Sequence, residues 1–282
     1  MASFPTSIEA LSIVLPAYNE EGAIGPVVEA LKALGLNAEI VVVDDGSTDA
    51  TARIAAEHGA TVVRRPGNGG YGRSVKSGVA HAKHDVIVVT DADGTYPIDK
   101  IPALLAEFEK GFDMVVGARQ GEAYRESFLK SLLRGVLKLI VEFATGRKIP
   151  DVNSGLRVFR ASTAKPYFPD ICDGFSFTTT ITLVYLLTHK AVSYVPISYS
   201  KRIGRSKVKM LRDTLRTFQY ITECIVRYNP LKIFLSLVIV ELIVGAIAWY
   251  AMGGAAFLFA FLFACLTIAL GLIAESMRRP RG

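Results

Sequence analysis

The sequence has few of the features that mark several common protein classes. Its three cysteines, Cys172, Cys224 and Cys265, have no paired spacing, so neither a metal or redox motif nor an oxidising compartment is indicated. Residues 1–11 have no basic start and no long apolar stretch. No signal peptide is therefore expected, and the soluble part is expected to remain in the cytoplasm. No nucleic-acid motif accompanies the net charge of +6, so nucleic acid is not an expected partner.

Charge is almost absent from residues 233–274, where Glu241 is the single charged side chain. Ile233–Met252 and Ala255–Ala274 are each about 20 residues long, the length that crosses a bilayer core. Gly253 and Gly254 leave room for a tight turn only. Cations stand at both outer ends, namely Arg227, Lys232, Arg278, Arg279 and Arg281. The pattern predicts a transmembrane hairpin with both ends on the cytoplasmic side rather than a buried helical pair.

Two further features of this end of the chain bear on partners. An ionised Glu241 inside a span is costly, so protonation, a polar protein surface or a contact with a second copy is expected. Of these, a contact between Glu241 and a second copy of the chain is favoured, and such a contact predicts a homo-oligomer. The segment 201–228 is strongly basic, which indicates anionic lipid headgroups or an anionic substrate, with a solvated helix face as the alternative. Its cations are Lys201, Arg202, Arg205, Lys207, Lys209, Arg212, Arg216 and Arg227, against Asp213 and Glu223.

Short apolar runs alternate with helix-like stretches in the first half of the chain. The runs are β-branched and continuous, which is typical of parallel strands covered on both faces. They are Leu11–Leu15, Ile40–Val43, Thr61–Val63, Val86–Val89 and Met114–Val116. Alternation at this interval predicts a doubly wound α/β sheet. Later in the chain we expect a polar loop over Asp151–Arg157, a helix over Phe177–His189 and a strand over Val192–Tyr199.

The most distinctive polar residues follow directly after three of these runs. They form the segments Pro16-Ala17-Tyr18-Asn19-Glu20, Asp44-Asp45-Gly46-Ser47 and Asp91-Ala92-Asp93-Gly94. In doubly wound sheets ligands bind beyond the carboxyl ends of the strands, so the three segments are expected to share one acidic rim.

Each of these segments has a chemical and a structural interpretation. Asp91 and Asp93 can share a hard divalent cation that holds phosphate oxygens, although the same pattern occurs in solvated turns. Asp45 can accept hydrogen bonds from a base or ribose, or help to cap the following helix. Tyr18 can pack on a nucleobase, and Glu20 can contact the base or occupy a first helical turn.

Residues 67–72, Gly-Asn-Gly-Gly-Tyr-Gly, formally match the dinucleotide fingerprint, with Asp91 about 20 residues later. That fingerprint normally follows the first strand of its fold, whereas here it follows the third. A nicotinamide or flavin site is therefore disfavoured. The glycines are expected to let the backbone approach a nucleotide.

Together the three acidic segments resemble family 2 glycosyltransferases of the GT-A fold. The segments Asp151–Arg157 and Arg202–Lys207 narrow the resemblance to the polyprenyl-phosphate branch, which includes dolichyl-phosphate mannose synthases and bacterial undecaprenyl-phosphate glucosyltransferases. The resemblance covers about residues 10–230. It implies a Rossmann-like, mostly parallel sheet, followed here by the two-helix hairpin.

The resemblance also implies roles for individual residues. The nucleotide sugar would contact Pro16, Tyr18, Glu20, Val43, Asp45, Asp91, Ala92, Asp93, Arg202 and Lys207. Mg²⁺ or Mn²⁺ would bind Asp91 and Asp93. The lipid phosphate would meet Arg119, with Arg125, Lys130, Ser131 and Arg134 as unranked candidates. Asp151 is treated as a base in similar enzymes, but a lipid phosphate is already an anionic nucleophile. We expect Asp151 instead to orient Arg157 or substrate hydroxyls.

These expectations define one favoured function and its alternatives. The chain would transfer a single sugar, with inversion, from a GDP- or UDP-hexose to polyprenyl phosphate at the cytoplasmic membrane face. The alternatives are a different glycolipid or polysaccharide acceptor, and a catalytically silent membrane scaffold. The expected divisions are a catalytic domain over 1–205, an amphipathic juxtamembrane helix over 206–230, the hairpin over 231–276 and a basic cytoplasmic tail over 277–282.

Overall fold

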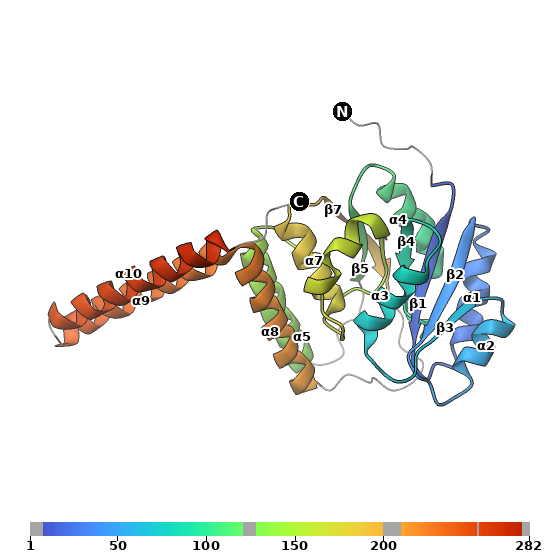
Figure 1. The fold of residues 1–282 in the computed structure, drawn as a ribbon, viewed down its shortest axis with the longest axis horizontal. Coiled ribbons are helices and arrows are strands. Elements are labelled where there is room, and N and C mark those ends of the chain that lie inside the picture. Colours follow the sequence, from blue (N-terminus) through green and yellow to red (C-terminus); the bar gives the residue numbers. More distant parts are fainter. Residues whose placement is uncertain (1–7, 121–127, 200–209, 253, 278–282) are drawn as a thin grey trace.

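The computed structural model describes residues 8–120, 128–199, 210–252 and 254–277, with side chains in 8–120, 135–199, 215–250 and 257–277. A seven-stranded sheet forms the centre of the N-terminal domain (Figure 1). In spatial order its strands are β3 (Thr61–Arg64), β2 (Ala38–Asp44), β1 (Leu11–Ala17), β4 (Val86–Val89), β6 (Arg157–Arg160), β5 (Met114–Gln120) and β7 (Val192–Ser198). Only β6 among these strands runs antiparallel to its neighbours, which are β4 and β5.

The strands form because their side chains are buried on both faces of the sheet. In β1, Ile13 and Leu15 pack into the core under α1 (Ile24–Ala33) and α4 (Ile101–Phe108). Val14 between them points to the opposite core, under α3 (Tyr71–His81) and α7 (Phe177–Leu187). Helices on both faces confirm the doubly wound α/β fold predicted from the continuous apolar runs.

All six strands expected from the sequence are present, but β6 was not expected. Its four residues, Arg-Val-Phe-Arg, follow directly on the polar loop and place an arginine at each end. Such a segment has no apolar run of its own, and its place in the sheet depends on pairing with β4 and β5. The expected helix from Phe177 also ends earlier than predicted, at Leu187, and His189 beyond it has a positive φ of 62°.

The remaining helices complete the domain and lead to the C-terminal end of the chain. They are α2 (Thr51–Glu57), η1 (Ile98–Lys100), α5 (Phe128–Thr145), α6 (Ala161–Ala164), η3 (Lys165–Asp170), α8 (Met210–Tyr228), α9 (Pro230–Met252) and α10 (Gly254–Ser276). Helices α5 and α8 lie side by side, and α9 and α10 project away from the domain as one hairpin (Figure 1).

Helices α9 and α10 are long and apolar enough to cross a membrane. Their spans cover 21 and 20 residues, and only 11% of each window is buried, unlike the core helix of a soluble protein. Close packing joins them: a Cβ on Gly245 would lie 2.3 Å from the Ala260 Cβ, and one on Gly271 would lie 2.7 Å from the Phe234 Cβ. Small residues that let helix backbones approach are typical of membrane helix pairs.

Glu241 lies within this helix pair. The Thr267 hydroxyl of α10 donates to the Glu241 Oε1 at 2.8 Å. The other carboxylate oxygen, Oε2, is buried and has no hydrogen-bond partner among the described residues. One oxygen of Glu241 thus accepts a hydrogen bond from within the same hairpin, whereas the sequence favoured a contact with a second copy. A homo-oligomer stays a prediction.

Gly78 allows α3 to pack closely on the sheet, so we expect Gly78→Ala to destabilise the domain. The added Cβ would lie 2.3 Å from a Val14 methyl group that is fully buried. Overpacking of this kind costs about 1–3 kcal/mol, which exceeds the helix-propensity gain of about 1 kcal/mol. Thermal unfolding in detergent should give a lower Tm. Gly135→Ala in α5 is the matched control, because nothing lies within 4 Å of its Cβ position and its Tm should not fall.

Candidate functional site

The first two polar segments of the rim interlock at the ends of β1 and β2. The Asn19 backbone N–H donates to the Ser47 hydroxyl at 2.9 Å, and the Thr48 N–H donates to the Asn19 side-chain oxygen at 2.8 Å. The Glu20 N–H donates to the Thr51 hydroxyl at 2.8 Å. Asn19 adopts a left-handed φ of 51°, which asparagine tolerates better than most residues. The segments around Tyr18 and Asp45 therefore form one connected loop structure.

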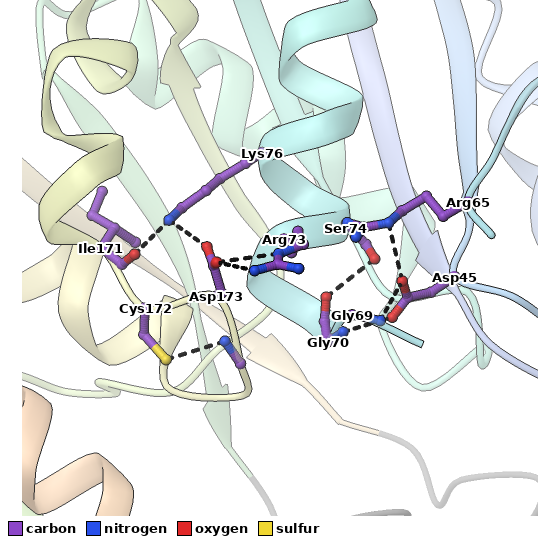
Figure 2. A network of polar contacts seen from close by, with 11 residues as sticks. Asp45, Arg65, Gly69, Gly70, Arg73, Ser74, Lys76, Ile171, Cys172 and Asp173 are labelled. Atoms are coloured by element: carbon purple, nitrogen blue, oxygen red, sulfur yellow. Dashed lines mark hydrogen bonds and ion pairs between the residues drawn. The ribbon is translucent and has the colours of Figure 1, made fainter. Parts of the chain in front are cut away.

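Asp45 anchors the glycine-rich loop to this structure (Figure 2). Its Oδ1 accepts from the Gly69 N–H at 3.0 Å and its Oδ2 from the Gly70 N–H at 2.8 Å. The Arg65 Nε lies 3.3 Å from Oδ1, and Asp45 is 4% exposed. These two loop amides thus point at a carboxylate of the protein itself. The predicted contact of Asp45 with a nucleoside stays a prediction, and it would use lone pairs beyond those engaged here.

The position of the glycine loop in the sheet weighs against a dinucleotide site. The loop follows β3, which is an edge strand of the sheet. It therefore does not follow a strand at which the spatial order of the strands reverses. Dinucleotide folds place their fingerprint at such a reversal, after the first strand. The structure therefore agrees with the sequence argument against a nicotinamide or flavin cofactor.

Asp91 and Asp93 follow β4 near the middle of the sheet. The Tyr71 hydroxyl donates to the Asp91 Oδ1 at 3.0 Å. The Asp93 Oδ1 accepts from the Thr95 N–H at 3.1 Å and from its hydroxyl at 2.7 Å, which closes a tight turn. Gly155 packs so closely on Asp91 that a Cβ there would lie 2.7 Å from Oδ1.

The acidic pair fits a hard divalent cation. No cluster of three or more His, Cys, Asp or Glu side chains suited to a metal occurs in the described part of the chain. Mg²⁺ and similar ions are commonly held by one or two carboxylates, with substrate phosphates and water completing the shell. A two-carboxylate donor set therefore suits an ion that arrives with a diphosphate better than a permanent structural metal.

Arg119, at the end of β5, forms a bidentate ion pair with Asp151. The Arg119 Nε lies 2.7 Å from Oδ2 and Nη2 lies 3.0 Å from Oδ1, and the Arg119 backbone N–H also donates to Oδ2 at 3.2 Å. The two side chains are 12% and 1% exposed. Burial of Asp151 opposes ionisation, but the hydrogen bonds and charge of Arg119 outweigh burial and lower the pKa of the carboxyl group. Asp151 therefore orients Arg119.

Asp151 was expected to orient Arg157 or substrate hydroxyls, and the first of these alternatives is wrong. Arg157 is fully buried and donates to the carbonyl oxygens of Ser154 at 2.8 Å and Val152 at 3.3 Å, and to the Thr182 hydroxyl at 3.0 Å. It makes no ion pair with a carboxylate in the described ranges. Its guanidinium instead closes the 151–156 loop on itself, and this loop presents Asp151 to Arg119.

Two tyrosines connect the acidic pair with Arg119, and the sequence did not single them out. Tyr96 is 4% exposed, and its hydroxyl accepts from the Gly155 N–H at 2.6 Å. Its ring packs edge-on against Tyr199 with centroids 5.3 Å apart. The Arg119 Cζ lies 5.3 Å from the centroid of the Tyr199 ring. Tyr96 and Tyr199 belong to the site because of contacts with residues distant in the chain, and no local sequence pattern predicts such contacts.

Several predicted residues cannot be placed in this site. Arg125, Arg202 and Lys207 lie outside the described residues. Lys130, Ser131 and Arg134 belong to α5, whose backbone is described there but whose side chains are described only from residue 135. Among the nucleotide candidates, Val43 and Ala92 are buried, while Pro16, Tyr18 and Glu20 are partly exposed at the rim.

Two hollows on the described surface lie beside the rim and at the opposite edge of the sheet. The smaller, of about 430 Å³, is lined by Asp44, Ser47, Thr48 and Arg65 and adjoins the predicted nucleoside segment. The larger, of about 640 Å³, lies where β4 begins, and Asp85 and Arg160 in its wall are 3.7 Å apart. Its size does not make it the active site, because the acidic pair and Arg119 lie at the other edge.

A mostly parallel sheet with this antiparallel β6 and an acidic pair after β4 is the architecture of the GT-A glycosyltransferases, a class of enzymes. Residues 12–168 match the family model described as Glycosyl transferase family 2, and the chain belongs to this family. The resemblance seen in the sequence is thereby confirmed.

Named relatives and solved structures agree with this assignment. An undecaprenyl-phosphate 4-deoxy-4-formamido-L-arabinose transferase of Pseudomonas fluorescens is 31% identical over 95% of this chain and 76% of its own length. A transferase of the same name from Salmonella paratyphi B is 25% identical over 96% of this chain and 89% of its own. Glucosyl-3-phosphoglycerate synthase from Mycobacterium tuberculosis, in complex with UDP, shares the fold, with a TM-score of 0.61 and 20% identity over 77% of this chain and 80% of that one.

Proposed function

We propose that the protein transfers a single sugar from a nucleotide-sugar donor to polyprenyl phosphate, with inversion and with the help of a divalent cation. The observation that carries this proposal is the combination of the rim with the hairpin. Asp91, Asp93 and the Arg119–Asp151 pair lie at one sheet edge of a chain that also has two helices long enough to cross a membrane. A membrane-borne anionic acceptor accounts for both features.

The relatives support the choice of acceptor. The two relatives described above, which match over 95% and 96% of this chain, are named as undecaprenyl-phosphate transferases. The sugar in their names, 4-deoxy-4-formamido-L-arabinose, is a first donor to test here, alongside the GDP- and UDP-hexoses expected from the sequence. Solved structures of the same fold contain Mn²⁺ with UDP, which makes that pair the first probe of the donor site.

In the proposed reaction, the residues of the acidic rim and Arg119 would neutralise the negative charges of the two reactants. Asp91 and Asp93 would hold Mg²⁺ or Mn²⁺, which when bound offsets the charge of the departing diphosphate. Arg119, fixed by Asp151, would offset the repulsion between two anionic reactants, since guanidinium groups pair well with phosphate oxygens. A lipid monophosphate is already an anionic nucleophile near neutral pH, so it need not lose a proton to a general base. Direct in-line attack would invert the anomeric carbon.

The apolar surface of α5 and α8 supports a membrane-facing orientation of the domain. Leu139 and Phe143 on α5 are 67% and 48% exposed, and Leu215 and Phe218 on α8 are 64% and 50% exposed. Neighbouring helices with exposed apolar side chains and adjacent cations suit the membrane interface. The cations at both outer ends of the hairpin favour a cytoplasmic location for the domain and both termini.

A product analysis tests the proposed function. Protein reconstituted with undecaprenyl phosphate and Mn²⁺ would be offered a panel of radiolabelled UDP- and GDP-sugars, including UDP-4-deoxy-4-formamido-L-arabinose. We expect one donor to yield a single-sugar lipid whose label is released by mild acid, as an anomeric phosphate link requires. A long polymer or an acid-stable glycolipid would refute the acceptor. Absence of metal-dependent binding to every donor would favour a silent scaffold.

A further inference from the structure

Tyr71, the first residue of α3, connects the glycine loop to the acidic pair. Its hydroxyl donates to the Asp91 Oδ1 at 3.0 Å, across 20 positions of the chain. A phenolic hydroxyl can donate to a carboxylate, whose oxygens are acceptors only when the group is ionised.

The ring of Tyr71 is held in place by aromatic contacts. Phe175 stacks on it with centroids 6.4 Å apart and an interplanar angle of 15°, and Phe177 meets it edge-on at 6.3 Å. The backbone around it is equally constrained. A Cβ on Gly72 would lie 2.2 Å from the Cys172 carbonyl oxygen, and Gly70 has a φ of 100°. The start of α3 is thus pressed against the turn that precedes α7.

Ion pairs fix the same turn to α3 at a second point (Figure 2). The Asp173 carboxylate lies 3.1 Å from the Arg73 Nη2 and 2.7 Å from the Lys76 Nζ. The Arg73 backbone N–H also donates to the Asp173 carbonyl oxygen at 2.8 Å. Tyr71 therefore reaches Asp91 from a rigid base, so its hydroxyl position is set by packing and not by the carboxylate alone.

Asp91 is confined from a second side by the 151–156 loop. Gly155 lies against its carboxylate, with no space for a Cβ, and the Tyr96 hydroxyl accepts from the Gly155 N–H at 2.6 Å. Two tyrosines from different parts of the chain thus contribute to the position of this carboxylate, one directly and one through Gly155.

We propose that Tyr71 is a positioning residue, whose hydroxyl holds the Asp91 carboxylate in the orientation that a divalent cation and the donor diphosphate require. This inference rests on the proposed function, since it takes Asp91 as a metal ligand. Carboxylates that bind metals are commonly hydrogen-bonded by a second group, and loss of that group lowers metal affinity about 10–100-fold.

The test compares Tyr71→Phe with the same change at a tyrosine whose hydroxyl has no hydrogen-bond partner among the described residues. Tyr185→Phe is the matched control, because Tyr185 is fully buried and its hydroxyl has no hydrogen-bond partner in the described ranges. Mn²⁺ binding to the full-length protein in the presence of UDP would be measured from the EPR signal of free Mn²⁺. We expect Tyr71→Phe to raise the Mn²⁺ Kd about 10–100-fold, and Tyr185→Phe to leave it unchanged.

Kinetics separate positioning from a direct role in the reaction. With saturating Mn²⁺, Tyr71→Phe should recover nearly the kcat of the unaltered protein, because only the metal affinity is reduced. Gly155→Ala approaches the same carboxylate from the other side and should weaken Mn²⁺ binding as well. The Tm of each variant, measured without metal, reports whether the fold is retained, and Gly155→Ala provides a second readout if Tyr71→Phe is unstable.

Each outcome bears on a specific statement. An unchanged Mn²⁺ Kd in Tyr71→Phe would overturn the inference while leaving the metal site intact. A fall in kcat that saturating Mn²⁺ does not restore would also overturn it. If the unaltered protein bound no Mn²⁺ with UDP or with any active donor nucleotide, the metal part of the proposed function would fail, and the role of Tyr71 with it.

Discussion

Replacement of Asp93 by asparagine is expected to lower sugar transfer about 10³-fold, and Asp91→Asn should have a similar effect. The physical reason is charge: an amide cannot hold a divalent cation as a carboxylate does, and the cation contributes several kcal/mol to transition-state stabilisation. Asparagine retains an Oδ1, so it still accepts from Thr95 and the turn after β4 is preserved. The initial rate of labelled lipid formation at fixed Mn²⁺ measures the effect.

Asp99→Asn is the control for this pair. Asp99 is also an aspartate near the rim, but its side chain is 72% exposed and its ion pair with Lys100 is long, at 3.5 Å. Its removal should change the rate less than about twofold, because exposed ion pairs contribute little. Removal of the metal with EDTA should abolish activity, and added Mn²⁺ should restore it. Full activity of Asp93→Asn, or indifference to EDTA, would contradict the metal role.

The elements that could be predicted from the sequence are those whose signal is local. Apolar β-branched runs identified five strands, and a 42-residue stretch with one charge identified the hairpin, since burial and length alone decide those structures. The acidic segments were predicted at one rim because parallel strands end at the same edge. Each of these predictions needs only the residues within or beside the element.

The pairings at the site could not be predicted, because they depend on contacts between distant positions. Arg119 and Asp151 are 32 residues apart, and the sequence indicated Arg157 or substrate hydroxyls as the partner of Asp151. The choice is made by β6, which places Arg157 beneath the loop, between Val89 and Val116, where its guanidinium closes the loop. Since β6 was itself missed, the partner of Asp151 was missed with it.

Disruption of the Arg119–Asp151 pair should have the largest combined effect on stability and activity. In Asp151→Asn, an NH₂ group would replace one carboxylate oxygen, and Arg119 would lose its charged partner at a position only 12% exposed. Breaking a buried pair in this way costs about 3–5 kcal/mol, so a clear fall in Tm is expected. Activity should fall about 100-fold, because the guanidinium would no longer be held toward the acceptor.

The pH dependence of stability provides a further measure of this pair. The folded-state pKa of Asp151 is lowered, so the pair contributes its stabilisation at pH values above the unfolded pKa of about 3.9. That stabilisation is lost as the pH falls through the lower folded pKa. Relative to Asp151→Asn, the unaltered protein should therefore lose its advantage in Tm only below about pH 4. An equal Tm for the two proteins at pH 7 would contradict a stabilising pair.

A double-mutant cycle decides whether Asp151 acts through Arg119 or as a general base. If Asp151 only orients the guanidinium, its loss should cost little once that group is gone, so Arg119→Ala/Asp151→Asn should be about as active as Arg119→Ala alone. If Asp151 removed a proton itself, the two losses would be independent and their effects on kcat would multiply. We expect the non-additive result, because a carboxylate engaged by the Nε, the Nη2 and the backbone N–H of Arg119 is a poor proton acceptor. A phosphate nucleophile, in addition, is already anionic near neutral pH and does not depend on a base to make it so.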